Sequence, residues 1–379
     1  MIRCEVITKQ DEIFQYREDW NSLFQSGKHE ASTSFEWTYA LLTTHLNKND
    51  SFLLIVLKDP EEVIGIVPLI ISKIKKYGQS IKTLFPISEY YNTHSDILLK
   101  YHSEQLIDAF ITSLYKINYQ WDVFRIGRFV ESNFTIDHIE AYLKKTSYKY
   151  EIHRKEPSFF IKFDNTYSDF LKKRSANFRS SLKKNKKKIS GEGCIEFLGL
   201  EKFDDILKAY EAVLQIEKDS WKHNHGTAIS SVEKQKNFYK KLCIDTFQAG
   251  WLHLFFLYLN NEPVAYDMGL IKDERYFYLK TSFKEKFRRY SPSMLLRAKL
   301  VENLTETGVR EVDFTGEPYE WQRRWTEDSR GHKSLIIYNN TLKAKLFSFY
   351  NNVRSKRKNT DSEGEIYYHN PLDLKPEKS

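Results

Sequence analysis

One order of predicted elements occurs twice in this chain, and it restricts the fold more than any other property of the sequence. The β-rich runs SFLLIVLK (51–58) and VIGIVPLIIS (63–72) are separated by Asp-Pro-Glu-Glu, a combination that predicts a β-hairpin. Residues 251–259 and 264–271 form a second such pair around the turn sequence NNEP. Because asparagine tolerates the positive φ of a tight turn, a second hairpin is expected there.

Each predicted hairpin is followed by a helix-like segment and then by a short strand that ends in glycine. These segments lie at 103–119 and 121–127 in the first half, and at 292–308 and 310–316 in the second. Residue identity between the halves is weak, but the recurring order is typical of a duplicated unit. We therefore expect an α/β fold with mixed sheets and two tandem domains. The expected boundaries are 1–156 for the first domain, 157–345 for the second and 346–379 for a mobile tail.

The composition excludes a disordered or low-complexity protein. Hydrophobic residues make up 41% and aromatic residues 15% of the chain, enough for a sizeable core. The three cysteines, Cys4, Cys194 and Cys243, lack CxxC spacing, so neither a disulfide framework nor a cysteine zinc site is expected. No stretch has the apolar length of a signal peptide or a membrane helix. The sequence therefore predicts a cytoplasmic protein without a transmembrane segment.

Positive charge is concentrated in one segment. The formal net charge is +8, from 59 lysines and arginines against 51 acidic residues, and nine of the basic residues lie between Lys172 and Lys188 without one acid. Apolar residues recur there at helical spacing, so 169–189 predicts an amphipathic helix with one lysine-rich face. Such a face suits an acidic polymer, an anionic lipid or tRNA, and a merely solvated face is the open alternative.

Signatures of several enzyme classes are absent from the sequence. It contains no GxGxxG, GxxxxGK[ST], GxSxG or HExxH pattern, so dinucleotide, P-loop, nucleophile-elbow and zincin sites lack their usual support. A connected block of short motifs is present instead in the second half. In chain order they are EKDSWK (217–222), GTA (226–228), VA (264–265), KT (280–281), YSP (290–292) and DFTG (313–316).

This succession resembles the GNAT-superfamily acyltransferases of the type associated with cellulose and polysaccharide biosynthesis. The N-terminal half is similar to the same family through FEW (35–37), VPL (67–69), the segment 91–96 and WD (121–122). The resemblance implies two tandem GNAT-like domains, as in the Fem-type aminoacyltransferases, with one half degenerate and the C-terminal half carrying the transfer site. It also implies acyl-CoA as the donor, with acetyl-CoA as the simplest case.

Three positions depart from the family's pattern. The glycine of its S-P-G motif is Ser293 here, the glycine of its D-F-x-x-G motif arrives one residue early at Gly316, and Gln322 stands where a lysine is usual. Gln322 is accordingly given no role. The departures also keep a non-catalytic binding module open as an alternative to an enzyme.

The start of the predicted helix at 292–308 is the expected donor site. A helix N-terminus offers free backbone N–H groups and a positive dipole end, which favour a phosphate such as the pyrophosphate of coenzyme A. Two arginines precede it and can pair with phosphate oxygens. The alternative is an ordinary helix start with solvated arginines. The expected cofactor-binding residues are Arg288, Arg289, Tyr290, Ser291 and Ser293.

Acyl transfer by direct attack needs a base near the attacking amine or hydroxyl and a donor to the developing oxyanion. Glu217 and Asp313 are the candidate bases, with capping or ion pairing as the alternative role. Asp267 interrupts an apolar strand and is a third candidate, unless it simply faces outward in an alternating strand. Lys280 is a candidate for orienting an acid group or the carbonyl, against the alternative of a surface lysine.

Candidate acceptor-binding residues come from both halves. Trp221 and Lys222 belong to the first motif of the block, and His94 and Asp96 lie in the polar segment YYNTHSD. The H-x-H pair at 223 and 225 lacks a third ligand, so no metal site is expected.

Three functions remain open. The leading hypothesis is a cytoplasmic acyltransferase that uses acyl-CoA to acylate an amine or hydroxyl of a small molecule or a cell-envelope precursor. The second keeps the fold and takes aminoacyl-tRNA as the donor, with the lysine-rich helix as its binding surface. The third is a non-catalytic module that binds anionic lipid or polysaccharide. Peripheral attachment to the inner membrane is compatible with each of them.

Overall fold

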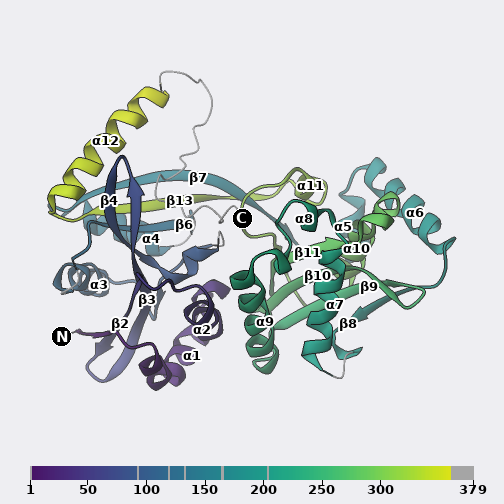
Figure 1. Ribbon diagram of the computed structural model, residues 1–379, viewed down its shortest axis with the longest axis horizontal. Coiled ribbons are helices and arrows are strands. Elements are labelled where there is room, and N and C mark those ends of the chain that lie inside the picture. Colours follow the sequence, from purple (N-terminus) through teal and green to yellow (C-terminus); the bar gives the residue numbers. More distant parts are fainter. Residues whose placement is uncertain are drawn as a thin grey trace. The chain divides into compact units, whose positions relative to one another are not determined.

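The computed structural model divides into two units (Figure 1). Unit 1 consists of the chain up to Pro157 and again from Arg330, and unit 2 of Ser158–Ser329. Strand β7 (Lys149–Lys162) begins in unit 1 and ends in unit 2, and each unit has its own hydrophobic core. The described residues are 2–91, 94–117, 120–131, 134–163, 166–202 and 205–359.

Unit 1 is built on a mixed sheet with the strand order β1-β2-β3-β4-β6-β13 and with β5 paired to β3. The pairs are antiparallel except β4 with β6, which run parallel. The hairpin β2-β3 is apolar along most of its length because helices and strands of the unit bury both of its faces. The elements are β1 (Arg3–Ile7), η1 (Asp11–Tyr16), α1 (Arg17–Gln25), η2 (Ala31–Thr33), α2 (Phe35–Thr44), β2 (Ser51–Asp59), β3 (Glu62–Lys76), β4 (Gln79–Pro86), η3 (Ile87–Tyr90), β5 (Leu98–Leu99), α3 (Glu104–Lys116), β6 (Val123–Val130), α4 (Phe134–Leu143), β13 (Ser329–Tyr338) and α12 (Leu342–Asn359).

Unit 2 contains a second mixed sheet, in which the last residues of β7 are followed by β12-β11-β10-β9-β8. Again one pair is parallel, here β11 with β12. Helix α10 packs on β9, β10 and β11, and α7 also packs on β10 and β11. The elements are α5 (Tyr167–Lys172), α6 (Ala176–Ser190), β8 (Ile195–Gly199), η4 (Leu200–Lys202), α7 (Ile206–Lys218), α8 (Trp221–Asn224), η5 (Ile229–Ser231), α9 (Glu233–Gln248), β9 (Leu252–Leu259), β10 (Glu262–Lys272), β11 (Arg275–Phe283), η6 (Glu285–Tyr290), α10 (Pro292–Glu306), β12 (Glu311–Asp313) and α11 (Glu320–Arg323).

The repeated order predicted from the sequence is confirmed. In unit 1 the hairpin β2-β3 is followed by α3 and β6, and in unit 2 the hairpin β9-β10 is followed by α10 and β12. Asn260 and Asn261 have the positive φ values, 49° and 65°, that the second turn requires. Each unit also has a third antiparallel strand, β4 or β11, between hairpin and helix, and that strand pairs in parallel with the strand after the helix.

The structure differs from the sequence-based expectation in three segments. The single helix expected over 169–189 is two helices, because Ser175 Oγ accepts a hydrogen bond from Phe178 N at 3.2 Å and so caps a new helix, α6. The second domain is expected to reach residue 345, whereas the chain from Arg330 belongs to unit 1.

A mobile tail is expected from residue 346, whereas α12 continues to Asn359 with Phe347 buried. The rest of that expected tail lies outside the described residues.

Candidate functional site

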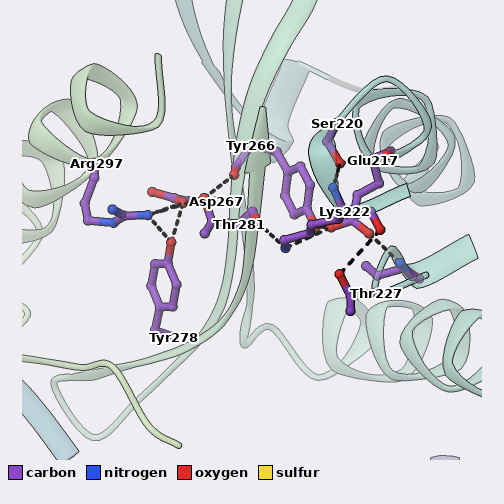
Figure 2. A network of polar contacts seen from close by, with 10 residues as sticks. Glu217, Ser220, Lys222, Thr227, Tyr266, Asp267, Tyr278, Thr281 and Arg297 are labelled. Carbon is purple, nitrogen blue, oxygen red and sulfur yellow. Dashed lines mark hydrogen bonds and ion pairs between the residues drawn. The ribbon is translucent and has the colours of Figure 1, made fainter. Parts of the chain in front are cut away.

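The candidate catalytic residues of unit 2 gather around two neighbouring strands, β10 and β11. Figure 2 shows Glu217 and Lys222 on one face of this strand pair and Asp267 with Arg297 on the other. Thr281 contacts both groups, because its hydroxyl accepts from Arg297 Nη2 at 3.3 Å and its carbonyl accepts from Lys222 Nζ at 2.5 Å.

Glu217 is fully buried in the last turn of α7, where its carboxylate accepts hydrogen bonds from three different elements. Tyr266 OH on β10 donates to Glu217 Oε1 at 2.7 Å, and Lys222 Nζ on α8 lies 3.2 Å from the same oxygen. Ile229 N donates to Glu217 Oε2. Burial, and then the charge of Glu217, raises the pKa of Tyr266 well above its usual value, so this tyrosine stays a proton donor.

Lys280 on β11 is partly buried and lies over the ring of Tyr239, with its Nζ 5.4 Å from the ring centre. Within the described residues its amine has no hydrogen bond and no ion pair. Burial, with the charge of Lys222 adding to it, lowers the pKa of Lys280 to about 8, and Glu217 opposes this shift. Lys280 is therefore a cation without a carboxylate of its own, close to a second cation.

Asp267 on β10 faces α10 and not solvent, so it is not the outward-facing strand residue of the alternative reading. Its Oδ1 accepts from Tyr278 OH at 2.6 Å and from Arg297 Nη2 at 3.1 Å. The Arg297 guanidinium also stacks over Trp321, 4.3 Å from the ring centre. Asp267 is thus the counter-ion of a buried arginine held among aromatic rings.

Asp313 ends β12 and is fully buried. Its Oδ2 accepts from Arg275 Nη2, and its Oδ1 accepts from Thr315 N at 2.7 Å. Both bonds match the alternative role expected for this residue, namely ion pairing and capping of a turn. Asp313 is thus held by partners of its own, Arg275 and Thr315.

The five expected donor-binding residues lie at the start of α10. Ser291 occupies the N-cap position, but with φ of 50° and without the side-chain cap hydrogen bond that its residue type suggests. Ser293 Oγ is shielded from solvent, and no described residue hydrogen-bonds to it. Arg288 and Arg289 are 74% and 70% exposed and make surface ion pairs with Glu285 and with Glu192. Such pairs are weak, so both guanidinium groups can turn to a phosphate.

Tyr290 and Ser291 are uncharged residues that fix the backbone where α10 begins. Tyr290 is 4% exposed and packs in the unit 2 core, with the Arg289 guanidinium 4.7 Å from its ring centre. Ser291 N donates to Arg288 O at 3.0 Å and so ends the preceding η6 turn. An unpartnered hydroxyl, a helix dipole and two exposed arginines fit the pyrophosphate of coenzyme A.

The expected acceptor-binding residues have different surroundings. Trp221 is 42% exposed and contacts His225 edge to face at 5.5 Å, while Lys222 points inward to Glu217. His225 Nδ1 donates to Trp221 O at 2.8 Å, so this histidine supports the turn. Across the described residues no cluster of three or more His, Cys, Asp or Glu side chains could hold a metal ion.

His94 and Asp96 belong to a buried polar cluster of unit 1. His94 Nδ1 lies 3.2 Å from Glu30 Oε2, and its ring lies 4.7 Å from that of His332. Asp96 Oδ2 lies 3.5 Å from His29 Nδ1. Asp96 also lines a small cavity together with residues of η2, β3 and β4. Both residues therefore belong to unit 1.

Three residues of the unit 2 networks are missed by the sequence analysis: Tyr266, Tyr278 and Arg297. The tyrosines sit in strands whose apolar pattern explains them as core residues, and Arg297 sits in an apolar helix stripe. A buried stripe interrupted by one arginine is a usable signal, because a charge at such a position requires a partner. The interrupting Asp267 on a neighbouring strand supplies it.

Comparison with known proteins gives one family match. Residues 176–323 match the model of the acetyltransferase (GNAT) domain. A comparison with curated proteins finds no sequence match. In the described part of the chain, no helix is both long and apolar enough to cross a membrane.

Solved structures resemble the chain over most of its length. FemX is 11% identical, with a TM-score of 0.62, over 91% of this chain and 99% of FemX. A conserved protein of unknown function from Bacteroides thetaiotaomicron VPI-5482 is 12% identical, with a TM-score of 0.55, over 89% of this chain and 100% of its own. The C-terminal domain of a putative lysylphosphatidylglycerol synthetase from Agrobacterium fabrum is 10% identical, with a TM-score of 0.53, over 88% and 95%.

At identities of 10–12% the similarity to solved structures establishes the fold alone. The family model applies only to residues 176–323, which it matches. That segment contains Glu217, Lys222, Asp267, Lys280 and the start of α10. The chain therefore has a tandem GNAT-like fold, and its residues 176–323 match the GNAT acetyltransferase domain.

Proposed function

We propose that this chain is an acyltransferase that moves an acyl group from acyl-CoA, with acetyl-CoA as the simplest donor, to an amine or hydroxyl. The acceptor is a small molecule or a precursor of the cell envelope or of a polysaccharide. The observation that carries the proposal is the GNAT domain match over 176–323, because the same residues hold the buried cluster of Glu217, Lys222 and Lys280. A cytoplasmic location follows from the use of acyl-CoA.

In the proposed reaction the acceptor attacks the thioester carbonyl directly. A nitrogen–carbon or oxygen–carbon bond forms, the carbon–sulfur bond breaks, and coenzyme A leaves as the thiol with the proton that the acceptor loses. Glu217 is the proposed base, since its carboxylate accepts hydrogen bonds from Lys222 and Tyr266 within the segment that matches the GNAT domain. Lys280 is the proposed donor to the developing oxyanion, since its ammonium group has no carboxylate partner among the described residues.

The transfer step is tested with acetyl-CoA and a panel of amines and sugars, by measuring release of the coenzyme A thiol. Glu217→Gln and Lys280→Met should each lower kcat by about 100-fold or more, the usual size of a base or an oxyanion donor. Glu233→Gln, on the exposed face of α9, is the matched control and should leave kcat unchanged. If both variants keep wild-type rates, the cluster is not the transfer site.

The pH dependence distinguishes the proposed role of Lys280 from that of a base. An oxyanion donor must be protonated, so kcat should fall as pH rises through about 8, the pKa of Lys280. A neutral lysine acting as base would give a rate that rises through the same range. In Lys280→Met the fall in kcat near pH 8 should be absent. A fall that persists in this variant would contradict the assignment.

The donor site is tested by calorimetry with coenzyme A, which does not depend on the acceptor. Arg288→Ala and Arg289→Ala should each weaken binding several-fold, because each removes one charge-assisted contact to phosphate. Lys299→Ala, later in α10 and paired with Glu302, is the control. Absence of binding heat and of any thermal shift at millimolar coenzyme A would remove acyl-CoA as the donor.

Aminoacyl-tRNA is the second candidate donor, and the surface of α5 and α6 is the observation that favours it. Seven of the nine basic residues there are exposed lysines, whereas Arg174 and Arg179 donate to backbone carbonyls of the unit. If tRNA is the donor, neutralising Lys183, Lys184, Lys187 and Lys188 together should abolish retention of RNA on the purified protein. Unchanged RNA retention, or coenzyme A binding by the wild type, counts against it.

A non-catalytic binding module is the third candidate, favoured by Ser293 and Gln322 in place of the usual glycine and lysine. Gln322 is buried, and its Oε1 accepts from Tyr319 N at 2.8 Å, so it caps α11. This capping contact accounts for Gln322 without a catalytic role. Detection of acyl transfer that disappears in Glu217→Gln would exclude this candidate.

A further inference from the structure

The last described helix of unit 1, α12, has two contrasting faces. Ala344, Phe347, Ser348 and Asn351 are buried against the unit. The apolar members of this face contact Ile81, Val123, Ile336 and Tyr338, and Asn351 Nδ2 donates to Glu151 Oε2 at 3.0 Å. The helix is therefore fixed to unit 1 along this side, and its other side is free to contact something else.

The opposite face of α12 exposes large apolar side chains. Leu342 is 73% exposed, Leu346 39%, Phe349 62% and Tyr350 46%. Their spacing of i, i+4, i+7 and i+8 places them in one stripe along the helix. Of the eleven large hydrophobic residues exposed in the described chain, these four are the only ones that share a helix face in this way. A continuous exposed stripe of this kind marks a contact surface.

Positive charge surrounds this stripe. The residues of α12, 342–359, include no acid, and Lys343 and Lys345 are exposed on either side of the apolar stripe. The sequence continues within the helix with Arg354, Lys356, Arg357 and Lys358. The surface thus combines apolar anchors with the exposed cations Lys343 and Lys345, on a helix whose sequence holds six basic residues and no acid.

The end of the β3-β4 hairpin extends the same surface. The ring of Tyr77 lies 5.9 Å from that of Tyr350, and Lys343 Nζ donates to Ser80 O at 3.2 Å. Lys73 and Lys75 are exposed on β3 in this hairpin. The described residues give neither of them an ion pair, so their charges add to those of α12.

We propose that α12 is an interfacial helix that docks unit 1 onto an anionic membrane surface. Its apolar stripe enters the boundary between headgroups and acyl chains, and the flanking Lys343 and Lys345 lie at the level of the anionic headgroups. Charge complementarity selects lipid over a second copy of this chain, because two copies of this all-cationic surface would repel each other. Helix α6 differs, because its apolar residues Phe178 and Ile189 are buried and it exposes no large apolar side chain.

The experiment is flotation of the full chain with vesicles of two compositions at low salt. The wild type should float with vesicles of equimolar phosphatidylglycerol and phosphatidylcholine, and not with phosphatidylcholine alone. Leu342→Ser and Phe349→Ser should each weaken this binding about tenfold, because each removes apolar area that the interface would bury. Both positions are exposed, so the fold should be retained, which circular dichroism checks.

The controls separate membrane docking from other contacts. Phe247→Ser removes an exposed aromatic residue from α9 and should leave vesicle binding unchanged. Added salt should weaken binding by screening the headgroup charge. Wild type that fails to float with anionic vesicles would overturn the proposal. So would a wild type that is dimeric by ultracentrifugation and becomes monomeric in Phe349→Ser, since the stripe would then bind a second copy. Neither result bears on coenzyme A binding or acyl transfer.

Discussion

At the scale of single residues, each buried carboxylate of unit 2 named as a candidate base has a cationic partner. Glu217 pairs with Lys222, Asp267 with Arg297, and Asp313 with Arg275. Burying an unpaired charge is costly, so such pairing is expected whatever the residue does. Glu217 differs from the other two because its partner is itself near an unpaired lysine, Lys280. That neighbourhood is the reason to assign chemistry to Glu217 and structure to Asp267 and Asp313.

Asp267→Asn tests the structural assignment. It should destabilise the protein by about 3–5 kcal/mol, because it leaves the buried Arg297 guanidinium without a counter-charge. Urea denaturation measures the change. Asp169→Asn, which breaks an exposed pair with Lys172, is the control and should change stability far less. Equal effects of the two substitutions would show that the Asp267 pair is not structurally important.

Lys280→Met should stabilise the protein near pH 7, by on the order of 1–3 kcal/mol, because burial of the charged amine opposes folding. The pKa of Lys280 is about 8 in the folded protein against 10.5 as its ordinary value. Between these values the unfolded chain binds the additional proton, so wild-type stability rises with pH and the advantage of Lys280→Met shrinks.

Urea denaturation at pH 7 and at pH 10 checks this, with Lys286→Met as the control. Lys286 is exposed and pairs with Glu262, so its replacement should have little effect at either pH. A destabilised Lys280→Met at pH 7, or a stability difference that does not change with pH, would contradict the assigned pKa.

At the scale of elements, local sequence signals predicted the hairpins and helices better than the breaks between them. The turn at Asn260 and Asn261 and the start of α10 at Pro292 rest on backbone requirements that a few adjacent residues reveal. The break at Ser175 was hidden because lysines continue on both sides and the apolar spacing survives it. A serine at an N-cap position outweighs that periodicity, since it satisfies a backbone N–H that a continuous helix would bond differently.

Ser175→Ala tests this account of the break. It should destabilise the protein by about 1 kcal/mol, the usual cost of losing an N-cap. Ser190→Ala, at the exposed C-terminal end of α6, removes a serine without a cap contact and is the control. Thermal unfolding followed by circular dichroism compares the two. No loss in Ser175→Ala would mean that the break has another cause.

The candidate site was predictable only in part, for a related reason. The order of the motifs identified Glu217, Asp267 and Lys280 as candidate catalytic residues. Sequence spacing alone does not reveal which of these side chains contact each other. Tyr266 contacts Glu217 from 49 positions away, because β10 and α7 pack together in three dimensions. The separation of Asp267 from Glu217 onto opposite faces follows from strand alternation between adjacent residues Tyr266 and Asp267.

At the scale of the whole molecule, the two units share an order of elements, and the proposed donor site lies in unit 2. In unit 1 the parallel pair β4-β6 extends over only Thr83 with Val123 and Leu84 with Phe124. Beyond this pair, the Glu89 carboxylate accepts a hydrogen bond from Gly127 N and lies 2.6 Å from Arg125 Nη1. The Glu89 side chain therefore occupies the edge of β6 that β4 leaves unpaired. This arrangement supports our proposal that donor binding belongs to unit 2 alone.

The most direct test of the central proposal is native mass spectrometry of the full chain titrated with coenzyme A. We predict one coenzyme A per chain for the wild type, and a marked loss of that complex when Arg288 and Arg289 are both replaced by alanine. Lys299→Ala should retain it. Binding of two molecules per chain would contradict the restriction to unit 2. Absence of any complex at millimolar coenzyme A would contradict acyl-CoA as the donor.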